Sequence, residues 1–224
     1  MTRIIDRIPE PEVMDDESEA DAYEAGDFRR VNSAIARRLQ RLATRREGRA
    51  VDLGTGPADI PILFCARAPG WHVTAVDASP AMLDLARRKV GAAGLARRIR
   101  LVQDDAKRLR RLRSRFDLVF SNSLLHHLLE PLPFWLQTRR LCRPEGVVFV
   151  QDLRRPPSRA AARAIVRRHS ARSDSPLLRQ LFYQSLLAAY TPAEVRAQLR
   201  ETGLELNVRA TTDRHLIAVG TPAG

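Results

Sequence analysis

The sequence predicts an α/β fold, a doubly wound sheet with helices on both of its faces. Short apolar runs of strand length alternate with segments whose apolar residues recur at helical spacing. Several of these runs end in an acidic residue. The first run, Arg49 to Leu53, stops at Gly54 and Gly56, and a helical pattern follows. A strand that ends in glycines and restarts as a helix lets a ligand approach the backbone in such folds.

The turn after the first strand has the composition of a ligand site. Gly54 and Gly56 can adopt positive φ and carry no Cβ, so the turn can be tight and a ligand can come close. Asp52 precedes the first glycine, and Ala58 stands where a dinucleotide-binding turn would have its third glycine. A carboxylate at the strand end suits an ammonium or sulfonium ion better than a pyrophosphate, which prefers N–H donors. The turn therefore argues against a nicotinamide-dependent dehydrogenase.

A second acid follows the next strand. The run from Trp71 to Val76 predicts a buried strand that ends in Asp77. This acid lies about 20 residues beyond the glycines, the separation at which an acid meets ribose hydroxyls in such folds. The alternative interpretation is that Asp77 only caps a turn. Ser79 and Pro80 fit the N-cap and first position of a following helix. The apolar face of that helix comprises Met82, Leu85, Ala86 and Val90.

Three further strands are predicted by apolar runs. The run Ile99–Gln103 leads into Asp104, Asp105 and Ala106, where an acid can accept a hydrogen bond from an adenine amino group. The run 116–122 leads into a polar segment that contains two adjacent histidines. A helix over 134–141, a turn over 142–146 and a fifth buried strand over 147–152 follow.

In this order and at these separations, the segments resemble the class I S-adenosylmethionine-dependent methyltransferases. The motifs that carry the resemblance are VDLGTGPAD, VDASPAML, QDDA, FDLVFSNSLLHHL and LCRPEGVVFVQDL, and together they cover residues 49–153. Within this class the chain is most similar to enzymes with small-molecule acceptors, such as the quinone-biosynthesis C-methyltransferases. It departs from the family pattern at Ala58, Asp104 and Glu145, where glycines are frequent. None of these departures removes a charged group that the cofactor needs.

The resemblance implies a Rossmann-like sheet of seven strands whose last strand is antiparallel, with S-adenosyl-L-methionine as cofactor. Residues 1–46 would form N-terminal cap helices, and residues 47–224 the methyltransferase domain, with a helical insertion at about 156–190. The resemblance also implies roles for residues at the strand ends. Asp52, Gly54 and Gly56 would line the methionine part of the cofactor, Asp77 would hold both ribose hydroxyls, Asp105 and Ala106 would bind the adenine, and backbone carbonyls of Ser121 and Asn122 would lie under the sulfonium.

Both ends of the chain are expected to build the acceptor site. Helices over 16–26 and 28–44 would cap the cofactor, with Tyr23 or Phe28 closing over it, or would simply pack on the sheet. Helices over 156–169 and 176–190 follow the fifth strand. A further helix runs from Pro192 to Thr202, and strands over 204–208 and 215–219 complete the sheet. The second insertion helix carries an apolar stripe that we expect to be core rather than acceptor pocket: Leu177, Leu178, Leu181, Phe182, Leu186 and Leu187.

Methyl transfer from a sulfonium needs alignment and desolvation, and a base helps when the acceptor must lose a proton. His126 and His127 follow the fourth strand at the mouth of the predicted pocket, and His127 is our candidate catalytic residue. A capping or packing role for this pair stays open. Arg154 or Arg155 would pair with an acidic acceptor or start a solvated loop. The segment after the fourth strand lacks the proline-proline-aromatic signature of N6-adenine and glutamine N-methyltransferases, which argues against those acceptors.

Composition is consistent with one domain. The chain has 224 residues, of which 44% are hydrophobic and 29% charged, in the range of globular proteins. No apolar run is long enough to span a membrane, and no export signal is expected from the acidic N-terminal segment. Cys65 and Cys142 lie far apart in the sequence. They predict neither a disulfide framework nor a zinc site, and a reduced, cytoplasmic protein is the simplest interpretation.

The net charge of +12 leaves a second partner class open. Such charge can bind nucleic acid through phosphates, which would make the chain an RNA methyltransferase. The arginines are spread along the whole chain, however, and aromatic residues are only 5%, whereas a nucleic-acid module usually clusters its charge and interleaves aromatics. We therefore favour a solvated basic surface. A non-catalytic cofactor-binding protein of the same fold is a further alternative.

Overall fold

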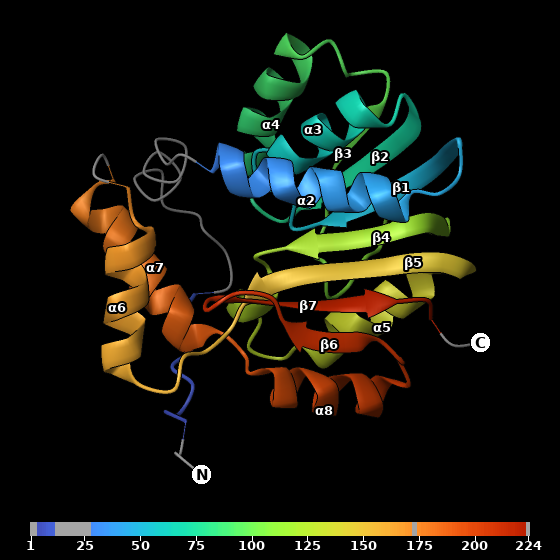
Figure 1. Cartoon of the computed structure of the whole chain (residues 1–224). Coiled ribbons are helices and arrows are strands. Elements are labelled where there is room, and N and C mark those ends of the chain that lie inside the picture. Colours follow the sequence, from blue (N-terminus) through green and yellow to red (C-terminus); the bar gives the residue numbers. More distant parts are fainter. Residues whose placement is uncertain (1–3, 12–27, 172–173, 223–224) are drawn as a thin grey trace.

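The computed structural model describes residues 4–11, 28–171 and 174–222. Within these residues the chain forms one sheet in the order β3-β2-β1-β4-β5-β7-β6 (Figure 1). Its strands are β1 (Glu47–Leu53), β2 (Gly70–Asp77), β3 (Ile99–Gln103), β4 (Phe116–Asn122), β5 (Cys142–Leu153), β6 (Asn207–Ala210) and β7 (His215–Gly220). The helices are α2 (Arg29–Leu42), α3 (Asp59–Arg67), α4 (Pro80–Ala92), the 3₁₀ helix η1 (Leu125–His127), α5 (Leu132–Leu141), α6 (Arg159–His169), α7 (Pro176–Ala188) and α8 (Pro192–Thr202).

The sheet confirms the predicted seven-stranded, Rossmann-like topology. Strands β1 to β5 pair in parallel, whereas β7 runs antiparallel to both β5 and β6. The chain builds one half of the sheet outward from β1 and then crosses back to β4 beside it. The strand order therefore reverses between β1 and β4. In open α/β sheets this reversal leaves a crevice at the carboxyl ends of the strands, where ligands bind.

Helices cover both faces of the sheet, and each face has its own apolar core. On one face α2, α3 and α4 pack through residues such as Leu39 and Phe64, both fully buried. On the other face α5 and α8 pack through residues such as Trp135 and Leu199. Figure 1 shows α2 to α4 on one side of the strands and α5 and α8 on the other. This double covering confirms the predicted doubly wound fold and fixes the strand ends relative to one another.

Helices α6 and α7 pack against each other at the end of the sheet where β4 finishes (Figure 1). Their shared core is a small cluster that includes Ala162, Ile165 and Leu186. Helix α6 begins later than expected, because the Ser158 hydroxyl accepts a hydrogen bond from the backbone N–H of Ala161 and so caps the helix there. The pair stands beside η1, with which α7 is in contact.

Two sequence expectations near the sheet are wrong. Residues 142–146 are not a turn but the irregular start of β5, where pairing steps from Phe116–Cys142 to Leu118–Val147. Pro144 and Gly146 suggested a turn, yet the backbone stays extended around a bulge. A Cβ at Gly146 would lie only 2.8 Å from the Cys142 Sγ, so glycine allows this close packing. Strand β6 also begins three residues later than the predicted 204–208 segment and ends at Ala210.

The N-terminal prediction is tested only in part. Helix α2 corresponds to the second expected cap helix, and Ile35 and Leu39 pack it on α3 and the sheet. The first expected helix, over 16–26, and Tyr23 lie outside the described residues. Within the described part of the chain, none of the helices combines the length and apolar character needed to cross a membrane.

Candidate active site

A cavity of about 430 Å³ opens at the carboxyl ends of β1 to β4. The elements that line it include α2, η1, α7 and the loop before β7. Strand-end residues from distant parts of the sequence therefore meet in one place. Those predicted to bind the cofactor all line this cavity except Ser121: Asp52, Gly54, Gly56, Asp77, Asp105, Ala106 and Asn122.

The glycine turn adopts the conformation that its sequence predicts. Gly54 and Gly56 have φ values of 73° and 53°, and Ala58 also has a positive φ of 61°. A Cβ added at Gly54 would lie 2.9 Å from a Leu124 methyl carbon, whereas a Cβ at Gly56 would meet nothing within 4 Å. Gly56 thus borders open space on the cavity, and its backbone is accessible to a ligand.

Asp52 is a buried acid beside this turn, with 2% of its surface exposed. Its Oδ1 has no hydrogen-bond partner among the described residues, and neither has the hydroxyl of nearby Thr55. Burial, and to a lesser extent the charge of Asp77, raise the pKa of Asp52 to about 8. A buried, unsatisfied carboxylate oxygen on a cavity wall is costly unless a ligand satisfies it. A cation is the ligand that would do so best.

Asp77 ties the glycine turn to the end of β2. Its Oδ2 accepts the backbone N–H of Gly56 at 2.7 Å, and its Oδ1 accepts that of Ser79 at 3.0 Å. Asp77 also lines the cavity. Ser79 itself caps α4 as predicted, with its hydroxyl accepting from Met82. The structure therefore shows Asp77 as a turn cap on the cavity wall, and its role as a ligand acceptor stays a prediction.

The two acids after β3 differ in their contacts. Asp104 accepts hydrogen bonds from its own loop, from the backbone N–H groups of Asp105, Arg110 and Arg111, and so holds that loop in place. Asp105 accepts the backbone N–H of Lys107, and it lines the cavity together with Ala106. Asp104 thus replaces a family glycine with a loop-capping acid, and Asp105 keeps acceptor capacity for a ligand.

The side chain of Ser121 points into the sheet, which leaves the predicted contact through its backbone carbonyl untested. Its side chain is 1% exposed and donates a hydrogen bond of 2.6 Å to the Leu53 carbonyl inside the sheet. It is not among the residues that line the cavity, whereas Asn122 is. The reason is that side chains alternate along a strand, so neighbouring residues face opposite sides. Ser121 therefore joins the ends of β4 and β1, and Asn122 is the residue that reaches the cavity.

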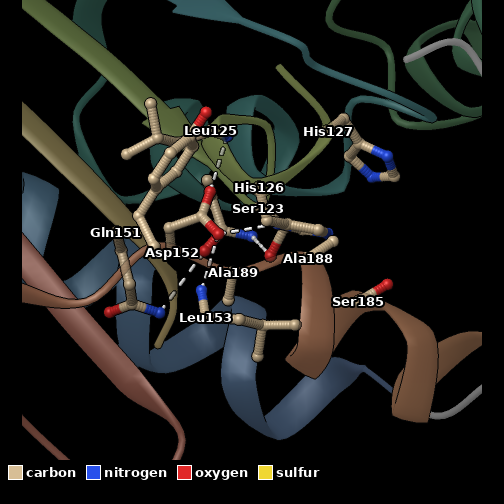
Figure 2. Close-up of polar contacts among 12 residues, drawn as sticks. Ser123, Leu125, His126, His127, Gln151, Asp152, Leu153, Ser185, Ala188 and Ala189 are labelled. Atoms are coloured by element: carbon tan, nitrogen blue, oxygen red, sulfur yellow. Dashed lines mark hydrogen bonds and ion pairs between the residues drawn. The ribbon is translucent and has the colours of Figure 1, made fainter. Parts of the chain in front are cut away.

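The histidine pair lies at the other end of the cavity and its members have different surroundings. His126 is 3% exposed, and its Nδ1 lies 2.6 Å from Asp152 Oδ1. Asp152 also accepts the backbone N–H groups of Leu125 and Leu153, both at 2.7 Å (Figure 2). Burial lowers the pKa of His126, but Asp152 and then Glu10 outweigh it, so the net pKa is raised. His126 is thereby held in one orientation.

Glu10 reaches this pair from the N-terminal segment. Its Oε1 lies 3.4 Å from His126 Nε2 and 3.2 Å from His127 Nδ1, and its Oε2 accepts from the Ser185 hydroxyl at 3.2 Å. Burial raises the pKa of Glu10, although the nearby His126 opposes this. His127 is more exposed than His126, at 17% against 4% for the side chains, and both line the cavity.

The insertion helices contribute to the cavity differently from the sequence prediction. The apolar stripe of α7 was expected to be core, but only its last turn, with Leu186 and Leu187, is buried. Leu178, Leu181 and Phe182 line the cavity instead. The stripe divides because the last turn of α7 is buried in the cluster shared with α6, whereas the preceding turns face the cavity.

The arginines considered as acceptor contacts, Arg154 and Arg155, instead bind other groups of the chain. Arg155 is buried, pairs with Glu194 at 2.5 Å and donates to the Ala189 carbonyl, while Arg154 donates to the Thr212 carbonyl. Neither lines the cavity, so the structure gives no support to a contact with an acidic acceptor, and Arg155 is buried rather than in a solvated loop. Arg214 lines the cavity instead, stacked on the Phe182 ring.

Comparison with known proteins agrees with this geometry. Residues 50–146 match the model of a methyltransferase domain. The chain is 28% identical, over 79% of its length, to trans-aconitate 2-methyltransferase of Mycobacterium tuberculosis, of which it covers 64%. It is 32% identical to demethylmenaquinone methyltransferase of Thermus thermophilus over 50% of each chain. Residues 50–146 are therefore a methyltransferase domain, with the motif order of the class I S-adenosylmethionine-dependent methyltransferases.

The fold of this methyltransferase agrees with the assignment. It is similar to a SAM-dependent methyltransferase structure from Aquifex aeolicus, with a TM-score of 0.66 and 19% identity over 91% of this chain and 97% of that one. The match to a methyltransferase domain supports S-adenosylmethionine as the cofactor, and the cavity suits it. The unsatisfied oxygen of buried Asp52 offers a partner for an ammonium, and the open space at Gly56 leaves room for a ligand chain. The chain spans less than two thirds of the length of the trans-aconitate and demethylmenaquinone methyltransferases that it matches.

Two residues of the methyltransferase site were missed at the level of sequence. Asp152 was recognised only as the end of a strand, although its contact with His126 orients that ring on the cavity wall. Its position at the carboxyl end of a central parallel strand was the available signal. Glu10 had no signal, because the segment over residues 4–11 has no regular secondary structure that periodicity could reveal.

Proposed function

We propose that this protein transfers the methyl group of S-adenosylmethionine to a small-molecule acceptor. The observation that supports this most strongly is that one cavity runs from the glycine turn to the histidine pair and α7. Cofactor and acceptor can thus lie end to end in one site. Alignment and desolvation are the main requirements for displacement at a sulfonium methyl group. The trans-aconitate and demethylmenaquinone enzymes are relatives whose names denote small acceptors.

The cofactor would be held as the strand-end pattern suggests. In our proposal Asp52 and the glycine turn receive the methionine part, and Asp77 receives the ribose hydroxyls. Asp105 and Ala106 receive the adenine, and Asn122 lies near the sulfonium. Ser121 stays a contact only through its backbone, because its side chain is turned to the Leu53 carbonyl.

The domain organisation stays a prediction. We propose residues 1–46 as a cap and 47–224 as the methyltransferase domain, with the insertion at about 156–190 shaping the acceptor end. Phe28 and Val31, at the start of the cap helix α2, and Leu178 and Leu181 of α7 all line the cavity. Apolar walls of this kind suit a compact organic acceptor. A cytoplasmic location remains a prediction from cysteine usage.

His127 remains our candidate catalytic residue. His126 is engaged with Asp152 through Nδ1 and is almost fully buried, whereas His127 is the more accessible ring on the cavity wall. An acceptor hydroxyl, amine or acidic carbon would be activated at this end. Replacing His127 with alanine should lower kcat by about 100-fold or more, the usual contribution of proton transfer, while leaving cofactor affinity within about twofold. An unchanged kcat would contradict this role.

The test of function is the fate of a labelled methyl group. Purified protein is incubated with methyl-labelled S-adenosylmethionine and a cell extract, which is then divided into RNA, protein and small-molecule fractions. We expect label in the small-molecule fraction, loss of label with Asp77→Asn, and no change with Asp84→Asn, which removes the same charge from an exposed position on α4. Label in RNA or in protein would refute the proposed acceptor class.

The RNA alternative has less support from the arrangement of the arginines. Arg98, Arg139 and Arg140 donate hydrogen bonds to backbone carbonyls, and Arg143 pairs with Asp117. These cations brace the fold and are not gathered around the cavity. If RNA were the acceptor, its binding should weaken steeply with salt, because several phosphates would release counterions. A flat salt dependence would count against this alternative.

A further inference from the structure

We propose that Glu10, His126 and His127 bind a divalent transition-metal ion, with zinc as the first candidate, at the acceptor end of the cavity. Two imidazoles and one carboxylate form a donor set that zinc uses in catalytic sites. The three residues come from two segments that the fold brings together. Glu10 lies in the irregular N-terminal segment over residues 4–11, and His126 and His127 lie in η1. This revises the sequence expectation of no metal site, which rested on the cysteines.

The distances between the donor atoms match those around one ion. Zinc lies about 2.0–2.2 Å from nitrogen and oxygen ligands, so two ligands of a tetrahedral ion are about 3.3 Å apart. Glu10 Oε1 lies 3.4 Å from His126 Nε2 and 3.2 Å from His127 Nδ1. The three donor atoms lie within 4.8 Å of one another, so a small rotation of the more exposed His127 ring would complete the set.

The surroundings of His126 are those of a metal ligand. Its Nδ1 is 2.6 Å from Asp152, so Nδ1 carries the proton and Nε2 presents its lone pair toward Glu10. A carboxylate behind a histidine in this way fixes the ring and makes it a better ligand. Asp152 is itself held by the N–H groups of Leu125 and Leu153. The ligand is thus oriented before any ion arrives.

Glu10 provides an independent observation. Its Oε1 is buried and accepts no hydrogen bond within the described residues, although its Oε2 is held by Ser185. The segment that carries it is anchored, because Arg7 donates to the carbonyls of Ala188, His126 and Leu128. A buried carboxylate oxygen without a donor, placed between two imidazole nitrogens, is satisfied by a cation. Without a metal, a proton on His126 is the competing cation.

Three protein ligands would leave the fourth position of the ion open toward the cavity, as catalytic zinc sites do. There the ion would bind an oxygen of the acceptor and make a hydroxyl group more acidic, so that its proton leaves to solvent. This use of the site rests on the proposed function. A histidine that holds the ion cannot also take the acceptor's proton. Metal binding by His127 and general-base action by His127 are therefore alternatives that one set of experiments separates.

The experiment measures metal binding directly on the full chain freed of any histidine tag. Protein treated with a chelator and dialysed is titrated with Zn²⁺ by calorimetry and with Co²⁺ by visible absorption. We expect one equivalent of zinc and the intense visible bands of tetrahedral Co²⁺. Glu10→Gln and His127→Ala should weaken zinc binding by about 100-fold or more, and Asp152→Asn by about 10- to 100-fold, as for other residues behind a ligand. His72→Ala, an exposed histidine on β2, is the matched control and should bind as the wild type does.

Calorimetric binding of S-adenosylhomocysteine confirms that each variant is folded, because none of the altered residues is assigned to the cofactor. The metal proposal is overturned if the wild type takes up no stoichiometric ion, or if it and His127→Ala bind zinc equally. It is also overturned if chelated protein methylates acceptor at the full rate, in which case the proposed function stands and His127 acts as the base. Zinc binding without any S-adenosylhomocysteine binding would instead contradict the proposed function and leave the metal site intact.

Discussion

Cofactor affinity should depend on pH through Asp52. This carboxyl group is fully buried on the cavity wall, and its pKa is raised to about 8 by burial and by the charge of Asp77. At neutral pH most of the free protein therefore holds Asp52 in its protonated form. If the ionised carboxylate receives the cofactor's ammonium, as we propose, binding must first release that proton. Affinity should then rise with pH until Asp52 is ionised in the free protein.

The size of the effect follows from the ionised fraction. With a pKa of about 8, roughly 1% of Asp52 is ionised at pH 6 and about 9% at pH 7, a ninefold gain worth about 1.3 kcal/mol. Cofactor affinity should rise less steeply as the pH passes 8, where half of the Asp52 carboxyl groups are ionised. The change to Asp52→Asn removes the titration, so the variant's affinity should be weak and nearly constant from pH 6 to 8.

The assay is isothermal calorimetry with S-adenosylhomocysteine at pH 6, 7 and 8, repeated in buffers with different ionisation enthalpies. The buffers report the proton released on binding, which should approach one per cofactor at pH 6 to 7 and vanish in Asp52→Asn. Asp84→Asn removes an exposed acid that pairs with Arg87 on α4 and should behave as the wild type does. A wild-type affinity that stays level between pH 6 and 7, or one that falls, would refute the role of Asp52.

The same titration predicts how stability responds to pH. The pKa of Asp52 is raised from 3.8 in the unfolded chain, so between about pH 4 and 8 the unfolded state loses its proton first. The free energy of unfolding should therefore fall across this range, by an amount on the order of 4 kcal/mol at pH 7. Asp52→Asn keeps a neutral side chain and should recover part of the unfolding free energy that the wild type loses as the pH rises. Urea unfolding at pH 5 and 7 would measure this recovery.

Two substitutions, each with a matched control variant, test which residues stabilise the fold. Gly54→Ala should lower the unfolding free energy by about 1–2 kcal/mol and weaken S-adenosylhomocysteine binding, because φ is 73° and the new Cβ meets Leu124. Gly91→Ala, within α4 and facing open space, should instead stabilise by about 0.5–1 kcal/mol, so equal effects would refute the strain argument. Arg155→Ala should destabilise by about 2–4 kcal/mol in urea without changing cofactor affinity, since it leaves Glu194 without its buried partner. The exposed Arg87→Ala should cost under about 1 kcal/mol, and a similar loss for both arginines would contradict this reasoning.

Local patterns predicted most of the secondary structure, because caps and periodicity are properties of neighbouring residues. Ser79 caps α4, and Thr191 with Glu194 forms a capping box at α8. The exceptions depend on distant partners. The start of β5 resembles a turn in sequence, but pairing of Cys142 with Phe116 extends it. Local propensity yields to sheet pairing whenever the partner strand supplies the hydrogen bonds.

The sequence alone predicted the proposed cofactor end of the site. A glycine turn and acids at successive strand ends predict a cation-binding nucleoside site, because parallel strands deliver their carboxyl ends to the same edge. The acceptor end was decided only by tertiary structure. Glu10, His126 and Asp152 lie on three separate segments, and their contacts arise from how the N-terminal segment and η1 pack beside β5. No periodicity records such long-range packing, so this cluster of side chains becomes visible only once the chain has folded.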